Sequence, residues 1–537
     1  MRFEIRLRIV ADEGEAISDE EVLTLEKDHE RIEAVGLSLG ESKTLLGHLQ
    51  RRIVEAQAAA HVARHRCCAV CGRPLRSKGR YPLTFRTPFG NVPLASPRFH
   101  RCFCQPANSR TFSPLNALFT EHTAPELLWL ETKWASLMAY GVSVDLLRDV
   151  LPLGAKANAE TVRRHLHRMA LRAEAELGQE QACFIAGCPA SWQELPHPEG
   201  PIVVGIDGGF VRDCEDRRNH FEVVVGRSMP EDRDSRYFGF VQSHDSRPRR
   251  RLFDLLTAQG LQANQELTFL TDGGGSVRGL ARLMSPCAEH ILDWFHVAMR
   301  LTVLSQYAKG LAQHSPKEAG DAEAHLEKTK WQLWHGDVRK ALLRSRWLVD
   351  DLGALESAYP GLKRFARLAG EFHTYIDNNA GTIPNYGERW RYGERISTGF
   401  VESTVNLVIG KRFAKKQQMQ WSKRGAHLLL QTRTRALDGT LRGLFERWFP
   451  GLANDNQPDI GRADAAWLPH ALWRSPALRV HSRKLPQGAT ELTRVPDSAV
   501  RSISSRFRDA PLPDYVNRCF LGCDGKRRRQ RCGGSSA

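Results

Sequence analysis

Between residues 201 and 300, short apolar runs alternate with segments whose apolar side chains recur at helical spacing. Ile202–Ile206 is such a run, bounded by Pro201 and by two glycines after Asp207, which is typical of a buried strand. The same criteria predict four more strands and two helices, at His220–Arg227, Tyr237–Ser243, Leu267–Thr271, Glu289–Leu292, Pro248–Gln259 and Ser276–Leu283. The pattern therefore predicts three strands connected by hairpins, followed by a strand–helix–strand unit.

Acidic residues end two of these strands. Asp207 ends the first predicted strand and Asp272 ends the fourth, and glycines follow both of them. A third carboxylate, Glu402, lies in the sequence GFVESTVN near the start of a helix predicted over Val401–Lys416. An Asp at a strand end, with glycines leaving room beside it, is well placed to hold a cation such as Mg²⁺, which prefers carboxylate oxygens. The alternative for Glu402 is a favourable interaction with the dipole of its own helix.

The predicted strand order is that of the ribonuclease-H fold, in which the first catalytic carboxylate lies on strand one and the second follows strand four. A doubly wound nucleotide-binding fold would need crossover helices where this sequence has hairpins. We therefore expect an α/β ribonuclease-H-like core over residues 201–296, completed by a final helix within residues 396–450.

The segment between these two parts of the core, residues 297–395, is predicted to be an all-helical insertion. Its tryptophans Trp331, Trp334 and Trp347 are expected to form its core, and contact with DNA ends is the alternative. From residue 454 to 537 Pro, Ser, Arg and short polar runs dominate, which predicts a basic, mostly disordered tail.

Upstream of the core, a first segment (residues 1–65) is predicted to hold a strand at Arg2–Val10, an acidic linker, and a helix from about Ser38 to Arg64. Residues 66–123 contain two cysteine pairs. Cys68 and Cys71 form a C-x-x-C motif, and Cys102 and Cys104 form a C-x-C motif after 30 intervening residues.

A β-hairpin is predicted between the two pairs, with strands at Tyr81–Arg86 and Asn91–His100. Cysteine pairs that a hairpin brings together are typical of a zinc-ribbon-like module with a structural Zn²⁺ held by four thiolates. Cys67 offers another register and His100 could replace a thiolate. Unligated buried thiols are the structural alternative.

Residues 124–186 are predicted to be helical, with helices at Glu126–Ala139, Val144–Val150 and Glu160–Glu176 and a break at Tyr140–Ser143. The last helix is expected to expose its basic side chains, which are Arg163, Arg164, His165, His167 and Arg168. A short helix, a turn and a basic helix are typical of a helix-turn-helix, whose second helix enters the major groove of DNA. A structural helical bundle is the alternative.

The charge balance narrows the class of partner. The 537 residues include 77 Lys and Arg against 61 Asp and Glu, a net charge of +16, which favours a polyanionic partner such as nucleic acid. A basic surface that only keeps the protein soluble is the alternative. No stretch approaches the about 18 apolar residues of a membrane span. The first residues lack the apolar segment of a secretory signal, and the cysteines do not resemble a secreted disulfide framework. We therefore expect a cytoplasmic protein. A bacterial, nucleoid-associated setting is implied only by the family resemblance that follows.

The resemblance to a known family rests on GIDGG around Asp207, TDGGG around Asp272 and GFVESTVN around Glu402, together with ILDWFHVAMRL (Ile291–Leu301) and KRFAKKQQMQW. In this order they resemble bacterial insertion-sequence transposases of the ISKra type. These belong to the DDE transposase group with a ribonuclease-H core, and the resemblance covers about Cys67 to Phe449. It implies that Asp207, Asp272 and Glu402 form the metal-binding catalytic triad.

The resemblance also implies that Asp293 and His296 form the D-x-x-H motif that follows the second Asp in several such groups. The alternative for this pair is a structural hydrogen bond at a strand–helix junction.

The reaction implied is Mg²⁺-dependent cleavage and strand transfer of DNA. Two Mg²⁺ ions, for which Mn²⁺ could substitute, would activate the attacking oxygen and stabilise the leaving one. The zinc module and the helix-turn-helix, with Arg163, Arg164 and Arg168, are expected to bind the terminal inverted repeats. The cluster expected to hold the DNA backbone is Lys411, Arg412, Lys415 and Lys416.

The expected assembly is a homodimer or a larger complex on terminal-repeat and target DNA. One rival interpretation is a non-catalytic zinc and helix-turn-helix regulator. Another is a nuclease on the same core that cleaves DNA without joining it.

Overall fold

The structure is a computed structural model. It describes residues 1–10, 16–28, 31–104, 110–154, 157–185, 189–192, 194–196, 198, 200–281, 284–285, 288–397, 399–413 and 420–453. The chain divides into two compact units, Met1–Pro458 and Asp459–Ala537, and all that follows concerns the first. The tail predicted for residues 454–537 lies outside the described residues. No helix among the described residues combines the length and the apolar character that crossing a bilayer requires.

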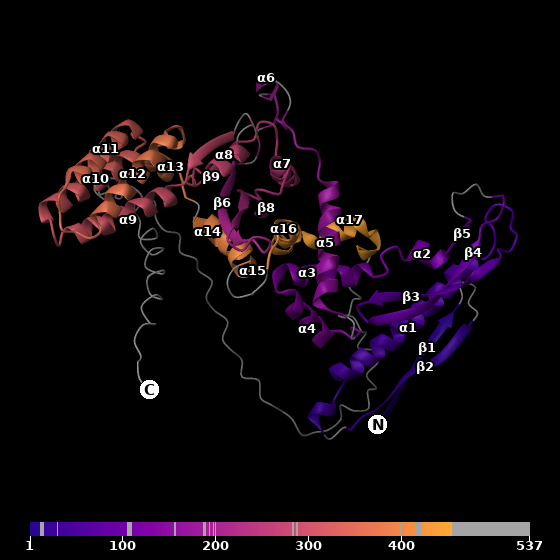
Figure 1. Ribbon diagram of the computed structural model, residues 1–537. Coiled ribbons are helices and arrows are strands. Elements are labelled where there is room, and N and C mark those ends of the chain that lie inside the picture. Colours follow the sequence, from indigo (N-terminus) through magenta and orange to yellow (C-terminus); the bar gives the residue numbers. More distant parts are fainter. Residues whose placement is uncertain are drawn as a thin grey trace, which may run out of the picture. The chain divides into compact units, whose positions relative to one another are not determined.

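The first unit contains a five-stranded mixed sheet with the strand order β10-β9-β6-β7-β8. Figure 1 labels β6, β8 and β9 of this sheet. Its strands are β6 (Ile202–Arg212), β7 (His220–Pro230), β8 (Arg236–Val241), β9 (Leu267–Thr271) and β10 (Ala288–Leu292). β6, β7 and β8 pair antiparallel, whereas β9 pairs parallel with both β6 and β10. All five predicted strands are confirmed, but β6 continues to Arg212, so Asp207 lies within the strand and not at its end.

Helices cover both faces of this sheet. On one face Val204, Ile206 and Phe240 pack against two helices, α7 (Pro248–Ala258) and α8 (Gly275–Ala281). On the other face Val211, Val223, Val225 and Val241 pack against residues of α3 (Pro125–Leu137), α4 (Tyr140–Val150), α5 (Ala159–Glu176) and the C-terminal helices. The alternation of side chains along β6 and β7 explains these two cores, because successive residues of a strand point to opposite faces. Because both faces of the sheet are buried, its strands need apolar side chains on both sides.

The chain that follows residue 398 returns to the second face of the sheet. It forms α14 (Gly399–Val405), a π-helix labelled η3 (Asn406–Gly410), α15 (Lys411–Phe413), α16 (Lys423–Leu437), α17 (Leu441–Trp448) and η4 (Pro450–Leu452). The single helix predicted over Val401–Lys416 is therefore interrupted by the π-helix. Single-turn π-helices of this kind occur often at functional sites.

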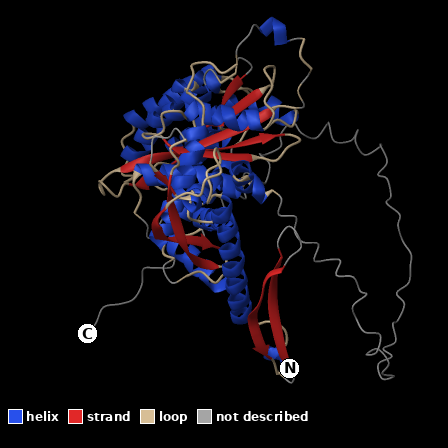
Figure 2. Cartoon of the chain, turned by 90° about the vertical axis from the view of Figure 1, so that its right-hand side faces the viewer, coloured by secondary structure: helices blue, strands red, loops and turns tan. Residues whose placement is uncertain are grey.

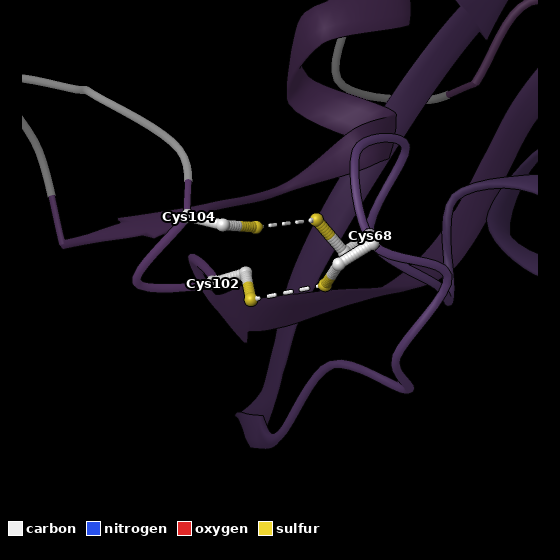
Figure 3. A group of neighbouring side chains, drawn as sticks. Cys68, Cys102 and Cys104 are labelled. Carbon is white, nitrogen blue, oxygen red and sulfur yellow. Dashed lines mark hydrogen bonds between the residues drawn. The ribbon is translucent and has the colours of Figure 1, made fainter.

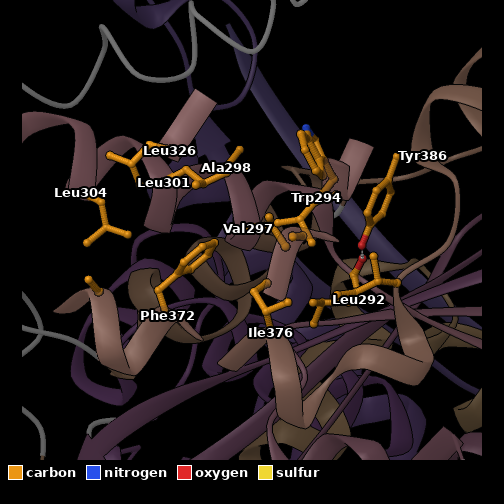
Figure 4. Packing of buried hydrophobic residues seen from close by; sticks show 14 of the residues in the cluster. Leu292, Trp294, Val297, Ala298, Leu301, Leu304, Leu326, Phe372, Ile376 and Tyr386 are labelled. Atoms are coloured by element: carbon orange, nitrogen blue, oxygen red, sulfur yellow. Dashed lines mark hydrogen bonds between the residues drawn. The ribbon is translucent and has the colours of Figure 1, made fainter. Parts of the chain in front are cut away.

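The predicted helical insertion forms α9 (Trp294–Leu311), α10 (Pro316–Trp334), α11 (Val338–Ala354), α12 (Leu362–Asn378), η2 (Ala380–Thr382) and α13 (Tyr386–Arg391). Its apolar core is continuous with the end of β10, as Figure 4 shows for Leu292, Trp294 and Tyr386. The expectation that the tryptophans form this core holds for Trp334, whose ring meets Trp294 edge-on. It is wrong for Trp347, which is 46% exposed and lies beside Arg344.

Helices α3 (Pro125–Leu137), α4 (Tyr140–Val150) and α5 (Ala159–Glu176) form the region predicted to be a helix-turn-helix. The break predicted at Tyr140–Ser143 lies instead at Met138 and Ala139, and Tyr140 begins α4. Asn158 caps α5 through a hydrogen bond from the Thr161 amide. The chain between α4 and α5 covers residues 151–158, which is longer than the three- or four-residue turn of a compact helix-turn-helix.

The N-terminal strand β1 (Arg2–Val10) and helix α1 (Leu39–Arg64) are confirmed, with a capping box at Ser38 and Glu41. The expected acidic linker contains strand β2 (Ala16–Glu26), which pairs antiparallel with β1 (Figure 2). The remaining elements are η1 (Ile32–Ala34), β3 (Ser77–Thr87), β4 (Gly90–His100), β5 (Thr111–Phe112), α2 (Pro114–Leu118) and α6 (Pro189–Trp192). β3 and β4 form the predicted hairpin. β3 begins four residues earlier than expected, toward Cys71, whereas β4 ends at His100 as predicted.

Candidate metal centres and nucleic-acid contacts

The hairpin β3–β4 brings four cysteines together. The sulfur atoms of Cys68, Cys71, Cys102 and Cys104 all lie within 4.8 Å of one another. Cys68 Sγ is 3.4 Å from Cys104 Sγ, and Cys71 Sγ is 3.5 Å from Cys102 Sγ (Figure 3). Four sulfurs around a tetrahedral Zn²⁺ with bonds of about 2.3 Å are about 3.8 Å apart, so the cluster has the size of a closed zinc site. These four cysteines can hold a metal ion such as zinc.

The loop before β3 prepares one thiolate. Its tight turn uses Gly72 at φ +72°, a left-handed conformation that glycine adopts without strain. The Gly72 amide donates to the Cys68 carbonyl over 2.9 Å, which closes the turn. Hydrogen bonds from the amides of Cys71 and Val70 lower the pKa of the Cys68 thiol to about 6. Negative charge is thus stabilised at this sulfur, as a metal-bound thiolate requires.

The other sulfurs share the remaining protons. The amide of Cys104 and the neighbouring thiols lower the pKa of Cys102, whereas hydrogen bonds with Cys102 and Cys68 raise the pKa of Cys104 to about 12. Four thiolates at these distances repel one another, so a divalent cation is needed for all four to be deprotonated. The alternative ligands Cys67 and His100 are not among the side chains that converge here.

The same region has an unusual charge balance that the sequence expectations overlooked. No Asp or Glu occurs between Glu55 and Glu121, although this stretch contains ten Lys and Arg residues. Those that the structure exposes are Arg64, Arg66, Arg73, Arg76, Lys78, Arg80, Arg86 and Arg110. Within the described residues none of them forms an ion pair closer than 4 Å. The region around the cysteine cluster therefore presents uncompensated positive charge to solvent.

The second candidate centre begins as a row of aspartates across three adjacent parallel strands. Ile206 of β6 pairs with Thr271 of β9, and Thr271 pairs with Leu292 of β10. The residue after each of these is an aspartate: Asp207, Asp272 and Asp293. Because neighbouring strands are about 4.8 Å apart, the strand register places the three residues side by side.

Glycines shape the backbone around this row. Gly208 and Gly274 donate their amides to Oδ1 of Asp207 and of Asp272, over 2.7 and 2.9 Å. Gly273 has φ +83°, and a Cβ there would lie 2.4 Å from Oδ1 of Asn379 and 2.8 Å from Leu292, so only glycine fits. The hydroxyl of Tyr375 on α12 donates to the Asp272 carbonyl over 3.0 Å. The helical insertion thus contacts the turn that holds the second aspartate.

Glu402 reaches this row from α14, which packs on β6 and β7. The close approach depends on Gly209, where a Cβ would lie 2.9 Å from Cδ1 of Ile409 and 3.7 Å from Val405. Burial raises the pKa of Glu402, and the charges of Asp207 and Asp293 raise it further, while His296 opposes them. Burial likewise raises the pKa of Asp207, and Asp272 and Asp293 add to this effect. The acidic groups from β6, β9, β10 and α14 therefore share one electrostatic environment.

Asp293 is fully buried and begins α9. Its Oδ1 accepts from the Phe295 amide and its Oδ2 pairs with Nδ1 of His296, each over 2.9 Å. Burial alone lowers the pKa of His296, but the hydrogen bond to Asp293 and the charges of Asp293, Asp207 and Asp272 outweigh it and raise the pKa. Asp293 thus orients His296 and favours its cationic form beside the other carboxylates.

The carboxylates are less closely gathered than the cysteines. Among the described residues, Cys68, Cys71, Cys102 and Cys104 are the set of three or more potential ligands whose donor atoms meet within 4.8 Å. Asp207, Asp272 and Glu402 do not form a second such set. Like charges separate unless a cation holds them, and two ions would also require ligands spread over more than one site.

Two buried arginines behind Glu402 escaped the sequence predictions. Arg433 on α16 donates to the carbonyls of Leu407 and Val408 in the π-helix, over 2.6 and 2.9 Å. It also donates to the carbonyls of Ser136 and Leu137 at the end of α3, over 2.6 and 3.4 Å. One guanidinium thus connects the end of α3 to the π-helix that follows α14. Its sequence signature is its spacing, because it continues the apolar stripe of Ala426, Leu429 and Leu430 at helical intervals.

Arg412 is the second buried arginine, and it corrects one prediction. It was expected in an exposed basic cluster, but it is 0% exposed and lies over the rings of Tyr140 and Trp421. Burial lowers the pKa of Arg412 to about 10, and its guanidinium donates to the Ala135 carbonyl over 3.3 Å. Lys411 is exposed, whereas Lys415 and Lys416 lie outside the described residues.

The basic residues predicted on α5 differ in exposure. Arg164 keeps 67% of its side chain exposed, and Arg163 and Arg168 keep 42% each while they pair with Glu160 and Glu121. His165 was expected at the surface but is buried, because its face of α5 packs on α3 and its Nδ1 meets Glu131.

A scan against protein-family models gives no match, and a search of curated proteins finds no significant relative.

Proposed function

We propose that this protein is a DDE-type DNA transposase with a ribonuclease-H-like core. It would bind the terminal inverted repeats of an insertion sequence and catalyse their Mg²⁺-dependent cleavage and transfer to target DNA. The observation that carries the proposal is the carboxylate group, because Asp207 lies on strand one of the sheet, Asp272 follows strand four, and Glu402 arrives on a later helix that packs beside them. The three hairpin-linked strands followed by two parallel strands also support this core.

The donor set suits Mg²⁺ chemically. Asp207, Asp272 and Glu402 offer only hard oxygen ligands, and a bound cation would offset the burial and repulsion that raise the pKa of Asp207 and Glu402. When bound, two such ions activate the attacking oxygen and stabilise the leaving one. The protein's own side chains would position the DNA. Asp293 fixes the ring of His296, and the cationic His296 can contact a phosphate oxygen of the DNA.

The zinc module supplies the second line of support. A polyanionic partner explains why its exposed Lys and Arg residues lack acidic neighbours. This surface takes over the backbone contacts that the sequence assigned in part to Arg412, which is buried. Arg164 of α5 remains available for base or phosphate contacts, since most of its side chain is exposed. A homodimer or larger assembly on paired DNA ends belongs to the same proposal.

The decisive experiment combines binding, cleavage and joining on DNA that carries the ends of the element. Wild-type protein is compared with Glu402→Gln and with Glu323→Gln, a control that removes one exposed carboxylate on α10 in the helical insertion. We expect Mg²⁺-dependent cleaved and joined products from wild type and Glu323→Gln. Glu402→Gln should bind the same DNA with unchanged affinity and give neither product.

The other outcomes identify the rivals. Cleavage that never yields joined product indicates a nuclease on this core. Specific binding without any Mg²⁺-dependent product, in wild type and variants alike, indicates a non-catalytic regulator. Activity that survives in Glu402→Gln shows that the third carboxylate is another residue.

A further inference from the structure

A cavity of about 720 Å³ lies at the free edge of the sheet, beside β8, and is separate from the carboxylate group. Residues of β8, α5, α7, α16 and α17 line it. Its volume falls within the range of pockets that bind small ligands. Four arginines contribute to the lining, which are Arg236, Arg251, Arg435 and Arg447.

The acidic residues of the lining already have partners. Asp254 pairs with Arg250 over 2.7 Å, and Glu176 pairs with Arg447 over 3.2 Å. Asp438 accepts hydrogen bonds from the amide and the hydroxyl of Thr440. Asp254 and Glu176 are thus engaged by other arginines, while Asp438 acts on Arg435 only through its charge and forms no ion pair with it within 4 Å among the described residues.

Arg251 is paired as well. It is 8% exposed and contacts Glu174 over 2.7 Å and Asp245 over 2.9 Å. Arg236 and Arg435 differ from it, because neither has a carboxylate within 4 Å among the described residues. The guanidinium of Arg435 donates to the carbonyl of Gln431 on its own helix over 2.7 Å. Its remaining donor groups are free for a ligand.

The buried charge of Arg435 also destabilises the fold when no anion is bound beside it. Burial lowers the pKa of Arg435, and the positive charges of Arg251 and Arg447 lower it further, although Asp438 and Glu174 oppose them. A desolvated charge without a paired acid is destabilising unless an anion enters beside it. The planar guanidinium presents pairs of N–H donors that match the oxygens of a phosphate.

We propose that this cavity is a binding site for a phosphate group, held by Arg435 and Arg236. The ligand is a phosphate ester, either a free nucleotide or the backbone of a nucleic acid. The room for it comes in part from Gly443 on α17, where an added Cβ would meet no atom within 4 Å. This site is independent of the proposed transposase reaction, because it uses none of the carboxylates assigned to metal binding.

The test is calorimetric titration of the full chain, without divalent cations, using inorganic phosphate, a deoxynucleoside monophosphate and a single-stranded oligonucleotide. Arg435→Gln removes the charge, and Gly443→Met fills the cavity without changing a charge. Arg424→Gln is the control, because Arg424 is an exposed arginine on the same helix that does not line the cavity.

We expect a phosphate-bearing probe to bind wild type and Arg424→Gln equally, and both cavity variants at least about tenfold more weakly. Binding of the mononucleotide as tight as that of the oligonucleotide identifies a free nucleotide as the ligand. Binding of the oligonucleotide alone, lost in both cavity variants, identifies the backbone. The proposal is overturned if no probe binds, or if Arg424→Gln weakens binding as much as Arg435→Gln does. Thermal unfolding of each variant verifies that it is folded.

Discussion

The two candidate metal centres are assembled in opposite ways. The four cysteines come from two short motifs at the base of one hairpin, and their sulfurs converge within 4.8 Å. The acidic group draws on β6, β9, β10 and α14, over a span of chain from Asp207 to Glu402, and its carboxylates do not converge to that extent. The cysteine site is thus a local structure, whereas the acidic site is a product of the packing of the whole core.

This difference has an energetic side. A hairpin of this size buries few apolar residues, so a bound metal would supply much of its stability. The acidic group instead raises the free energy of the fold, because burial and repulsion raise the pKa of Asp207 and Glu402. It is held in place by contacts that have no part in metal binding, such as the bonds of Arg433. Removal of bound metal should therefore disrupt the fold around the four cysteines but leave the arrangement of the carboxylates intact.

The largest effect is expected from zinc loss. We predict about one zinc per chain, and Cys71→Ser should lose the metal and unfold the hairpin, because a structural zinc contributes on the order of 10 kcal/mol. Metal analysis measures the first result. Hydrogen exchange of the amides in residues 66–104 measures the second.

The matched control is Cys67→Ser, which changes an exposed neighbouring cysteine outside the cluster. It should retain the metal and the protection of the hairpin. Equal loss of zinc in both variants would show that Cys67 is a ligand, and zinc retained in Cys71→Ser would exclude the four-cysteine site.

The contrast also explains what the sequence could predict. The motif spacing of Cys68, Cys71, Cys102 and Cys104 sufficed for the cysteine cluster, because a hairpin fixes the distance between its ends. The strands that carry Asp207 and Asp272 were predictable from apolar runs. Their registration with Asp293 was not, since nothing local in the sequence specifies which residues of distant parallel strands become neighbours.

The errors have related causes. Arg412 and His165 are polar residues whose local sequence resembles an exposed helix face, and only packing between distant helices buries them. The π-helix after Glu402 is stabilised by Arg433, which donates a hydrogen bond to the carbonyl of Val408 although it lies 25 residues further along the chain. Such contacts override the local helical preference that predicted one continuous helix over Val401–Lys416.

The second largest effect should come from Arg433→Gln. The change leaves carbonyls of α3 and of the π-helix without their donor, and each buried acceptor left unsatisfied typically costs about 1–3 kcal/mol. Chemical denaturation measures this cost. Hydrogen exchange should show lower protection in residues 399–413, while zinc content stays unchanged because the cysteine site is local.

Arg424→Gln serves as the control for this prediction, because it changes an exposed arginine in the first turn of the same helix. Its effect should remain below about 0.5 kcal/mol. If Arg433→Gln is as mild as this control, the link between α3 and the helix of Glu402 does not stabilise the fold.

A smaller effect is expected from filling the space at Gly209. A valine there would force Ile409 and Val405 away from β6, with an expected cost of about 1–3 kcal/mol. Gly209→Ala should cost less, because the nearest atom is the end of the flexible Ile409 side chain. Denaturation curves of both variants give the comparison. Equal stability of Gly209→Val and wild type would show that α14 does not need this close contact.

The smallest effect concerns His167 on α5, which sequence reasoning placed at the surface. Burial lowers its pKa to about 4, and the charges of Arg163 and Arg424 contribute. A histidine with a lowered pKa in the folded state stabilises the fold above its unfolded pKa of 6.5, and this stability is lost as the pH falls from there toward 4. Between pH 7 and 5, wild type should therefore lose about 1–2 kcal/mol more stability than His167→Gln, which cannot take up the proton. The two stability profiles, measured by denaturation across this range, should converge at the acidic end. Parallel profiles would mean that His167 is open to solvent in the folded protein, and that the packing around this part of α5 is loose.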